Sequence, residues 1–289
     1  MTCPDDGMWV WSKLSARKWV DVWEELLTGN PGSVITEVKG GRTIRVTVYC
    51  ETERDAITLK ESFGGSVRNV KSRDWVAEQA LICRKPLVIR DRLIVTDAYA
   101  AGKIESLRQQ WPEREIIVIP AGVAFGTGGH ATTSSCLRML CDFAQAERGR
   151  SWTMIDAGCG TGVLAIAAVK LGAVHADAFD FDEKAVEVAR KNCERNGLES
   201  ERISVFCGDV FRWSPAKPAD LVTANLFSTI LQRSFPRLAA ALKPGGALVV
   251  SGILNAQWQE TLEAARRNGL VCERVVRRGK WTTARLGHQ

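Results

Sequence analysis

Apolar residues follow two different periods along the first quarter of the chain. Alternating or β-branched apolar positions predict four strands, at residues 8–12, 34–38, 43–49 and 66–71. Residues 16–27 and 53–63 have helical periodicity, and in the first of these Trp19 and Leu26 share the apolar face. The order strand, helix, strand, strand, helix, strand is typical of a ferredoxin-like module, which we place at residues 1–75.

Strand and helix patterns then alternate regularly to the end of the chain. The strands are expected at residues 152–156, 176–180, 203–206, 219–224, 246–252, 271–276 and 281–286. The helices between them are expected at residues 162–171, 183–196, 228–242 and 256–268. This alternation predicts a doubly wound α/β sheet, in which ligands bind beyond the carboxyl ends of the strands. We assign residues 119–289 to this domain and residues 76–118 to a linker region.

The most specific motif is a glycine-rich turn between a buried strand and a helix. Asp156 ends the strand, and Gly158, Gly160 and Gly162 let the backbone turn sharply and approach a ligand. Asp180 ends the next strand, where an acid can accept hydrogen bonds from both hydroxyls of a ribose.

A dinucleotide site would have its third glycine one residue later, and the charge of Asp156 would oppose a pyrophosphate. The pattern therefore favours S-adenosylmethionine, which carries a sulfonium, an ammonium and a ribose but no phosphate. A structural turn in some other α/β protein is the alternative.

Two further polar residues follow strands of the predicted sheet. Asp209 comes after the third strand and could reach an adenine edge, or could equally serve as a turn residue. Asn225 ends the fourth strand beside the glycine turn, where its carbonyl could accept a hydrogen bond from an amine that receives a methyl group. The alternative for Asn225 is a helix N-cap.

A second glycine-rich segment, residues 120–133, precedes a helix expected at residues 134–143. It contains Phe125, Thr127, His130 and the paired threonines Thr132 and Thr133. A plain flexible linker, which is the alternative, would not normally carry Phe125, His130 and paired threonines. We expect this segment to wrap the methionine end of the cofactor and to shape the substrate entrance, with Thr133 contacting the cofactor.

Composition excludes several other classes of protein. The chain has a net charge of +6 and nine cysteines without C-x-x-C pairs, and only three histidines, so neither a disulfide framework nor a metal site is expected. No run of about 18 apolar residues and no signal peptide is present, so we expect a cytoplasmic protein without membrane contact. Basic residues are spread along the chain without an aromatic-interleaved motif, so direct nucleic-acid binding is not expected.

These motifs together resemble the PrmA family, whose members methylate lysines and the N-terminal amine of ribosomal protein L11. The resemblance lies in the Ala-Phe-Gly-Thr-Gly-x-His-x-Thr-Thr loop, the Asp-x-Gly-Cys-Gly-Thr-Gly turn and the Ala-Asn after the fourth strand, and it covers about residues 74–289. It implies a class I S-adenosylmethionine-dependent methyltransferase (Rossmann-like) domain preceded by a small ferredoxin-like domain that recognises the substrate. The family's cofactor-binding positions fall on Thr133, Gly158, Asp180 and Asn225.

The chain departs from the family pattern after Asn225, where Leu-Phe-Ser-Thr replaces an Ile-Leu-Ala type run. Its N-terminal module is also divergent and rich in tryptophan, and a basic enzyme is unexpected for a basic ribosomal substrate. Two alternatives to the family function therefore stay open. The chain could methylate another protein or a small molecule, or it could be a non-catalytic adaptor that has kept the fold.

Overall fold

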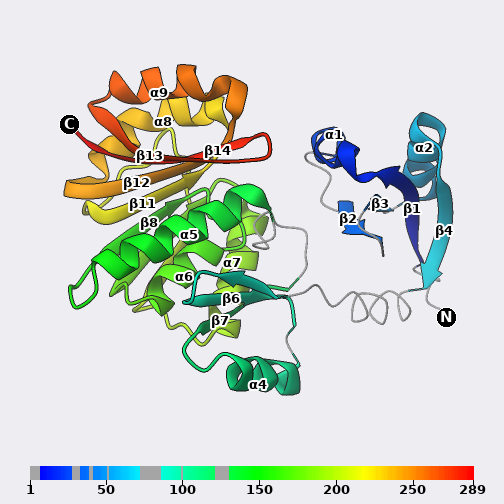
Figure 1. Cartoon of the computed structure of the whole chain (residues 1–289), viewed down its shortest axis with the longest axis horizontal. Helices are drawn as coiled ribbons and strands as arrows, with labels where there is room; N and C mark the ends of the chain where they lie inside the picture. Colours follow the sequence, from blue (N-terminus) through cyan, green and yellow to red (C-terminus); the bar gives the residue numbers. More distant parts are fainter. Residues whose placement is uncertain are drawn as a thin grey trace. The chain divides into compact units, whose positions relative to one another are not determined.

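The computed structural model describes residues 7–27, 33–38, 42–50, 52–71, 86–98, 100–120 and 130–289. The chain forms two units, Met1–Cys83 and Arg84–Gln289, and each is described here by itself (Figure 1). Among the helices of the described residues, none combines the length and the apolar character needed to cross a membrane.

The first unit is a four-stranded antiparallel sheet with two helices. Its elements are β1 (Gly7–Ala16), a 3-10 turn η1 (Arg17–Trp19), α1 (Val20–Leu26), β2 (Ser33–Glu37), β3 (Thr43–Cys50), α2 (Glu53–Phe63) and β4 (Ser66–Lys71). The strands lie in the order β2-β3-β1-β4, which confirms the ferredoxin-like fold. The fully buried Trp11 lies at the centre of the core, with its ring centroid 6.0 Å from that of Trp23.

Helix α1 has apolar residues on two faces. Trp23 and Leu27 are buried in the core, whereas Trp19, Val22 and Leu26 have exposed fractions of 49, 42 and 52%. The expectation that Trp19 and Leu26 belong to the buried face is therefore wrong. The tighter η1 turn rotates the chain by more per residue than an α-helix does, which separates Trp19 from the α1 core face.

Residues 86–118 belong to the second unit, so the expectation of a linker over 76–118 is wrong for this part. They form β5 (Leu87–Ile89), β6 (Leu93–Thr96), α4 (Ala101–Gln110) and β7 (Glu115–Val118). The three strands make a small sheet in the order β5-β6-β7. Ile89, Leu93 and Ile117 are fully buried in the main core, and this burial fixes the segment in place.

The main sheet of the second unit has seven strands in the order β10-β9-β8-β11-β12-β14-β13. Its strands are β8 (Thr153–Ala157), β9 (His175–Asp180), β10 (Ile203–Cys207), β11 (Ala219–Asn225), β12 (Leu242–Leu254), β13 (Leu270–Arg278) and β14 (Trp281–His288). Only β14 runs antiparallel to its neighbours, β12 and β13. The fold is therefore the doubly wound α/β fold expected from the sequence.

Helices cover both faces of this sheet (Figure 1). One core contains α5 (Ala131–Ala146), α6 (Val163–Lys170) and α7 (Glu183–Arg195), and the other contains α8 (Ser228–Ala240) and α9 (Trp258–Arg266) after the turn η2 (Asn255–Gln257). The strand order reverses between β8 and β11, and ligands of open α/β sheets bind at such a point.

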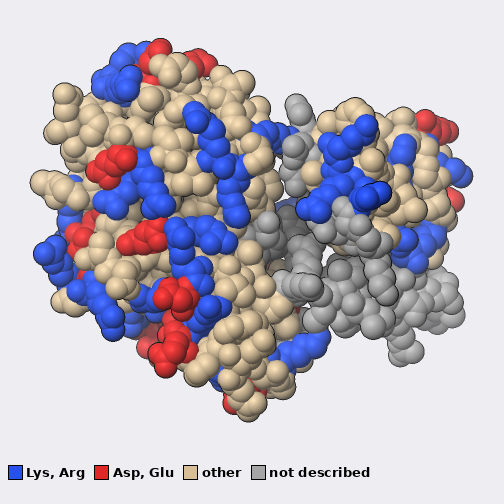
Figure 2. Space-filling view, in the orientation of Figure 1, with Lys and Arg blue, Asp and Glu red and all other residues tan. Residues whose placement is uncertain are grey.

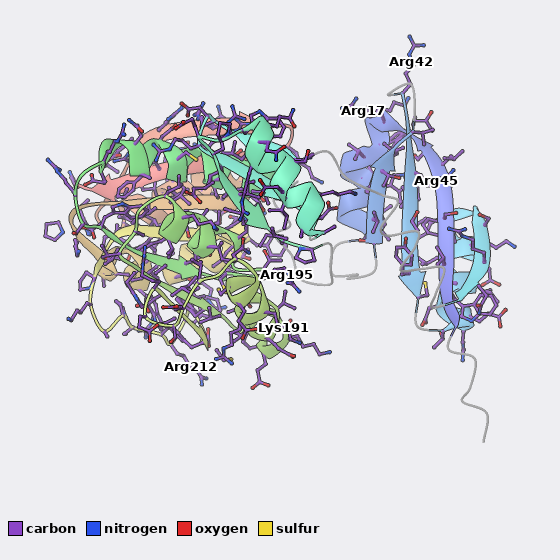
Figure 3. All side chains as sticks on the ribbon, turned by 90° about the horizontal axis from the view of Figure 1, so that it is seen from below. Arg17, Arg42, Arg45, Lys191, Arg195 and Arg212 are labelled. Carbon is purple, nitrogen blue, oxygen red and sulfur yellow. The ribbon has the colours of Figure 1, made fainter. Side chains whose placement is uncertain are left out.

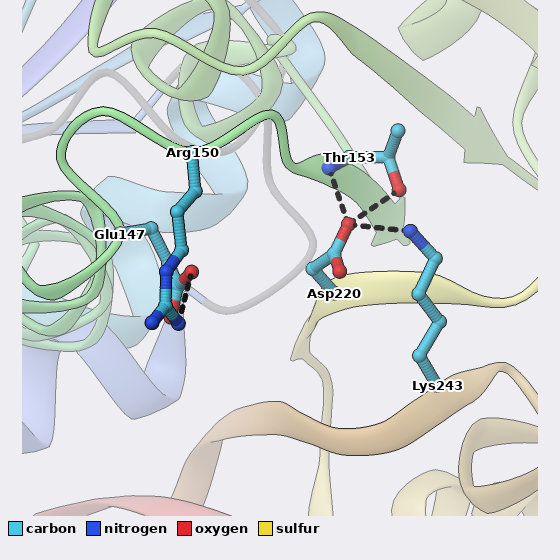
Figure 4. A network of polar contacts seen from close by, with 5 residues as sticks. All are labelled: Glu147, Arg150, Thr153, Asp220 and Lys243. Carbon is cyan, nitrogen blue, oxygen red and sulfur yellow. Dashed lines mark hydrogen bonds and ion pairs between the residues drawn. The ribbon is translucent and has the colours of Figure 1, made fainter.

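The amino ends of the central strands are tied together at the edge away from that point (Figure 4). Asp220 Oδ2 accepts hydrogen bonds from Thr153 N at 2.7 Å and Thr153 Oγ1 at 3.0 Å, and from Lys243 Nζ at 2.7 Å. Burial raises the pKa of Asp220, but the bonds from Lys243 and Thr153 outweigh it, so the net pKa is lowered. One carboxylate therefore joins the starts of β8, β11 and β12.

Candidate functional site

The glycine turn between β8 and α6 is held against the neighbouring strand by its own backbone. Gly158 N and Cys159 N both donate to Phe179 O, at 2.9 Å. Gly158 has a φ of 74°, and a Cβ added there would lie 2.4 Å from Leu226 Cδ2. Only glycine fits this position, because any side chain would meet both the strain of a positive φ and the side chain after β11.

Asp180, at the end of β9, binds the same turn with its side chain. Its Oδ2 accepts from Gly160 N at 2.9 Å and its Oδ1 accepts from Asp182 N at 3.1 Å. A carboxylate oxygen has about two acceptor sites, so each oxygen keeps one for a ligand. Gly160 and Gly162 both have positive φ, and α6 begins directly after Gly162.

Asp156 lies beneath this turn and is completely buried. Thr223 Oγ1 donates to its Oδ1 at 2.5 Å, whereas its Oδ2 is buried and has no hydrogen-bond partner that meets the usual geometric criteria within the described residues. Burial raises the pKa of Asp156 to about 7, the charge of Asp180 adds to the rise, and the bond from Thr223 opposes it. A cationic ligand group would compensate the unpaired oxygen.

Thr223 was missed by the sequence analysis. The signal was present, because Thr223 stands two residues before Asn225 and therefore shares its face of β11. Their strand lies next to β8, with Thr223 opposite Asp156 in the ladder.

The Asn225 side chain at the end of β11 is oriented by two hydroxyl groups. Its Nδ2 donates to Thr132 Oγ1 at 3.2 Å and lies 3.5 Å from Thr133 Oγ1. Its Oδ1 is buried and has no hydrogen-bond partner in the described part of the chain. The N-cap alternative for Asn225 is wrong, because Phe227 caps α8 and makes no side-chain cap bond. Asn225 thus presents an unused acceptor.

His130 extends this network from the first turn of α5, which begins at residue 131 rather than at the expected residue 134. Its Nδ1 accepts from Thr132 N at 3.3 Å and lies 2.7 Å from Thr132 Oγ1. The His130 ring also meets Trp281 edge-on, with centroids 5.3 Å apart. The sequence analysis assigned roles to His130, Thr133 and Asn225 but not to Thr132, which connects them. Phe125 and Thr127 lie outside the described residues.

Asp209 forms a turn after β10. Its Oδ1 accepts from Phe211 N at 2.9 Å, and its backbone carbonyl accepts from Arg212 N and Trp213 N. Gly208 N donates to Asp180 O at 2.9 Å, so the turn adjoins the ribose acid predicted from the sequence. The turn role of Asp209 is therefore shown, and a contact with adenine stays a prediction.

These groups fit S-adenosylmethionine. The buried Asp156 and the available Asp180 acceptors suit ammonium and ribose hydroxyl donors. No cluster of His, Cys, Asp and Glu in the described ranges is arranged to hold a metal ion.

Comparisons with known proteins agree with this geometry. The family model described as ribosomal protein L11 methyltransferase (PrmA) matches residues 37–288. A ribosomal protein L11 methyltransferase of Syntrophomonas wolfei is 31% identical over 87% of this chain and 82% of its own length. One from Agrobacterium fabrum is 36% identical, with 81% of this chain and 78% of that protein covered.

A solved structure described as a ribosomal protein L11 methylase, from Lactobacillus delbrueckii subsp. bulgaricus, is also similar. It has a TM-score of 0.60 and 26% sequence identity, and the match covers 71% of this chain and all of that one. The chain belongs to the PrmA family of ribosomal protein L11 methyltransferases and is a methyltransferase with S-adenosylmethionine as its cofactor.

Proposed function

We propose that this enzyme methylates amino groups of ribosomal protein L11, the side-chain amines of lysines and the N-terminal amine. The observation that carries the proposal is the buried Asn225 Oδ1, which has no hydrogen-bond partner among the described residues and lies at the strand end beside the glycine turn. The names of the relatives support the identity of the substrate.

The amine must be neutral when it reacts. An unperturbed lysine has a pKa of about 10.4, so neutralising it at pH 7 costs roughly 4–5 kcal/mol. Bound S-adenosylmethionine supplies an electrophilic methyl group on a positively charged sulfur. Asn225 Oδ1 would accept an N–H of the neutral amine and so direct the nitrogen lone pair toward the methyl group. Desolvation of the amine and the charge of the sulfonium disfavour the ammonium form. The proton leaves to water.

We further propose that the first unit docks the protein substrate. Trp19, Val22 and Leu26 form an exposed apolar stripe on and beside α1, and exposed groupings of this kind mark interaction sites. Lys18 Nζ lies 5.3 Å from the centroid of the Trp19 ring at the edge of the stripe. The seven cysteines of the described residues are free thiols, which suits an enzyme working beside ribosomes in the cytoplasm.

The direct test is methyl transfer to purified substrates. The enzyme is incubated with isotopically labelled S-adenosylmethionine and either ribosomal protein L11 or a mixture of the other ribosomal proteins, and the products are analysed by peptide mass spectrometry. We expect whole methyl groups on lysines and the N-terminal amine of L11, and none with Asn225→Ala over the same time. Label on another protein, with L11 unmodified, would show that the proposed substrate is wrong and that the proposed methyl transfer is right.

A further inference from the structure

Six arginines from three distant parts of the sequence meet along one side of α5. Arg138 lies on α5 itself, and the others come from the β5–β6 turn and from β13 and β14. We call this surface the arginine face; its members are Arg90, Arg92, Arg138, Arg274, Arg278 and Arg285. Figure 2 shows Lys and Arg side chains gathered over α5 and the strands beside it, with carboxylates between them.

The acidic side chains on this face do not neutralise it. Arg90 Nη2 and Arg274 Nη1 both donate to Asp142 Oδ2, at 2.9 and 2.8 Å. Arg285 pairs with Glu273 at 2.7 Å, and Arg92 donates to the neutral Gln145. With Asp91 counted as well, six guanidinium groups face three carboxylates.

The excess positive charge of the arginine face acts on the partly buried side chain of Arg138. Arg138 Nε is buried and has no hydrogen-bond partner among the described residues. Burial, followed by repulsion from Arg278 and Arg90, lowers the pKa of Arg138. An anion placed on this face would lower this repulsion, because it would supply the missing negative charge.

A shallow depression of about 300 Å³ lies on the same face. It is lined by Met139, Asp142, Glu273, Arg274 and Arg285. Its volume is at the lower end of the range for small-ligand sites, and its two arginines are those that pair with Asp142 and Glu273.

We propose that the arginine face binds the phosphodiester backbone of RNA. The cations that define it are all arginine, and the guanidinium fork matches phosphate oxygens in a way that lysine does not. The chain carries a net charge of +6, and on the proposed function its substrate is itself a basic ribosomal protein. RNA bound to the substrate would bridge two proteins that otherwise repel each other.

The position of the face suits this role. Arg278 Nη1 donates to Ser134 Oγ at 3.0 Å, and Ser134 directly follows Thr133 in α5. The arginine face therefore begins within one helical turn of the residues that orient Asn225, and it continues along α5 to Gln145. RNA held there would lie beside the entrance to the reaction site of the second unit.

Two exposed cations of the second unit are held in ordinary ion pairs within their own helices. Figure 3 labels Arg17, Arg42 and Arg45 on the first unit, and Lys191, Arg195 and Arg212 on α7 and the turn after β10. Lys191 pairs with Glu187 one helical turn away, and Arg108 of α4 pairs with Glu105 in the same manner. Both are well exposed, so they serve as matched controls.

The test measures binding of an RNA stem-loop of ribosomal sequence by fluorescence anisotropy, with the full chain and a series of salt concentrations. The variant Arg92→Gln/Arg274→Gln is compared with the control Arg108→Gln/Lys191→Gln, which loses the same charge. We expect the first variant to weaken binding and to lower the slope of log affinity against log salt by about two, whereas the control keeps the wild-type slope. Circular dichroism checks that both variants are folded.

Three results would overturn the proposal: no RNA binding by the wild type at low salt, an equal loss in both variants, or equally tight binding of polyglutamate, which would indicate an acidic protein partner. Methylation of free ribosomal protein L11 is measured in parallel and should stay within about twofold in the first variant. Lack of methylation of L11 by the wild type would refute the proposed function. The measurement of RNA binding does not depend on that result.

Discussion

At the scale of single residues, the proposed chemistry depends on the orientation of Asn225. Because Thr132 and Thr133 take its amide nitrogen, the oxygen is the atom left for the substrate amine. We predict that Asn225→Ala lowers kcat by more than about tenfold, since an orienting bond of 1.4 kcal/mol already corresponds to a factor of ten. Single-turnover methylation at saturating cofactor measures the effect.

The variant Asn225→Asp tests whether the side chain at position 225 accepts a hydrogen bond from the amine or only fills space. A carboxylate can still accept from the amine but loses the amide donor, so we expect activity between that of the Ala variant and the wild type. Near wild-type turnover in both variants would show that another group orients the amine.

The buried Asp156 should make the free energy of unfolding depend on pH. Its pKa is raised to about 7 mainly by burial, with Asp180 adding to the rise. As pH increases from 4 to 7, the unfolded chain loses this proton while the folded chain keeps it, so the contribution of Asp156 to stability falls and is lost above its folded pKa.

We expect Asp156→Asn to lack this dependence. Between pH 5 and pH 8 the free energy of unfolding of the wild type should fall by roughly 2–3 kcal/mol relative to the variant. Urea unfolding without cofactor at the two pH values measures it, and the other titrating groups cancel in the difference. Parallel pH profiles would mean that Asp156 is ionised in the folded protein well below neutral pH.

At the scale of elements, the first turn of α5 and the end of β11 are joined by hydrogen bonds to the Asn225 side chain. Thr132 lies between His130 and Asn225, whereas Thr133 is at a longer 3.5 Å from the Asn225 amide. We predict that Thr132→Val lowers kcat by about three- to tenfold with little change in affinity for S-adenosylhomocysteine, because the amide loses its closer partner. Thr133→Val should instead weaken that affinity, since Thr133 is the predicted cofactor contact. Steady-state kinetics and calorimetry on the pair distinguish the two roles, and identical profiles would refute the assignment.

Sequence reasoning succeeded where local chemistry dictates structure. The bounds of α2 follow from the Thr52 side chain, which accepts from Asp55 N, and from Gly64 and Gly65 after the helix. Gly158 and Asp180 were found because their backbone and charge requirements act within one strand–turn–helix motif. The roles of Thr132 and Thr223 were missed because they depend on partners 93 and 67 residues away. The arginine face was missed for the same reason, since its cations become neighbours only after the sheet has formed.

At the scale of the whole molecule, we propose that the two units divide recognition from chemistry. Every described side chain of the site belongs to the second unit, and the exposed apolar stripe belongs to the first. We predict that Val22→Ser/Leu26→Ser raises the KM for the protein substrate by about tenfold with nearly unchanged kcat and cofactor affinity, because it removes docking area only.

The matched control is Ile57→Ser on α2, where an apolar side chain is 40% exposed outside the stripe. It should leave the KM unchanged. An equal effect of the control would mean that polarity of the first unit in general, rather than the stripe, governs substrate affinity.

The contact between Gly158 and Leu226 also couples the substitutions that the two positions can accept. Because a Cβ at Gly158 would lie 2.4 Å from Leu226 Cδ2, a change at either position alters what the other tolerates. Shortening Leu226 relieves the collision but not the positive φ of Gly158, so Gly158→Ala should be only partly rescued by Leu226→Ala in a double-mutant cycle. The dependence is therefore one-directional: a smaller residue at position 226 removes the collision, but the positive φ still requires glycine at position 158.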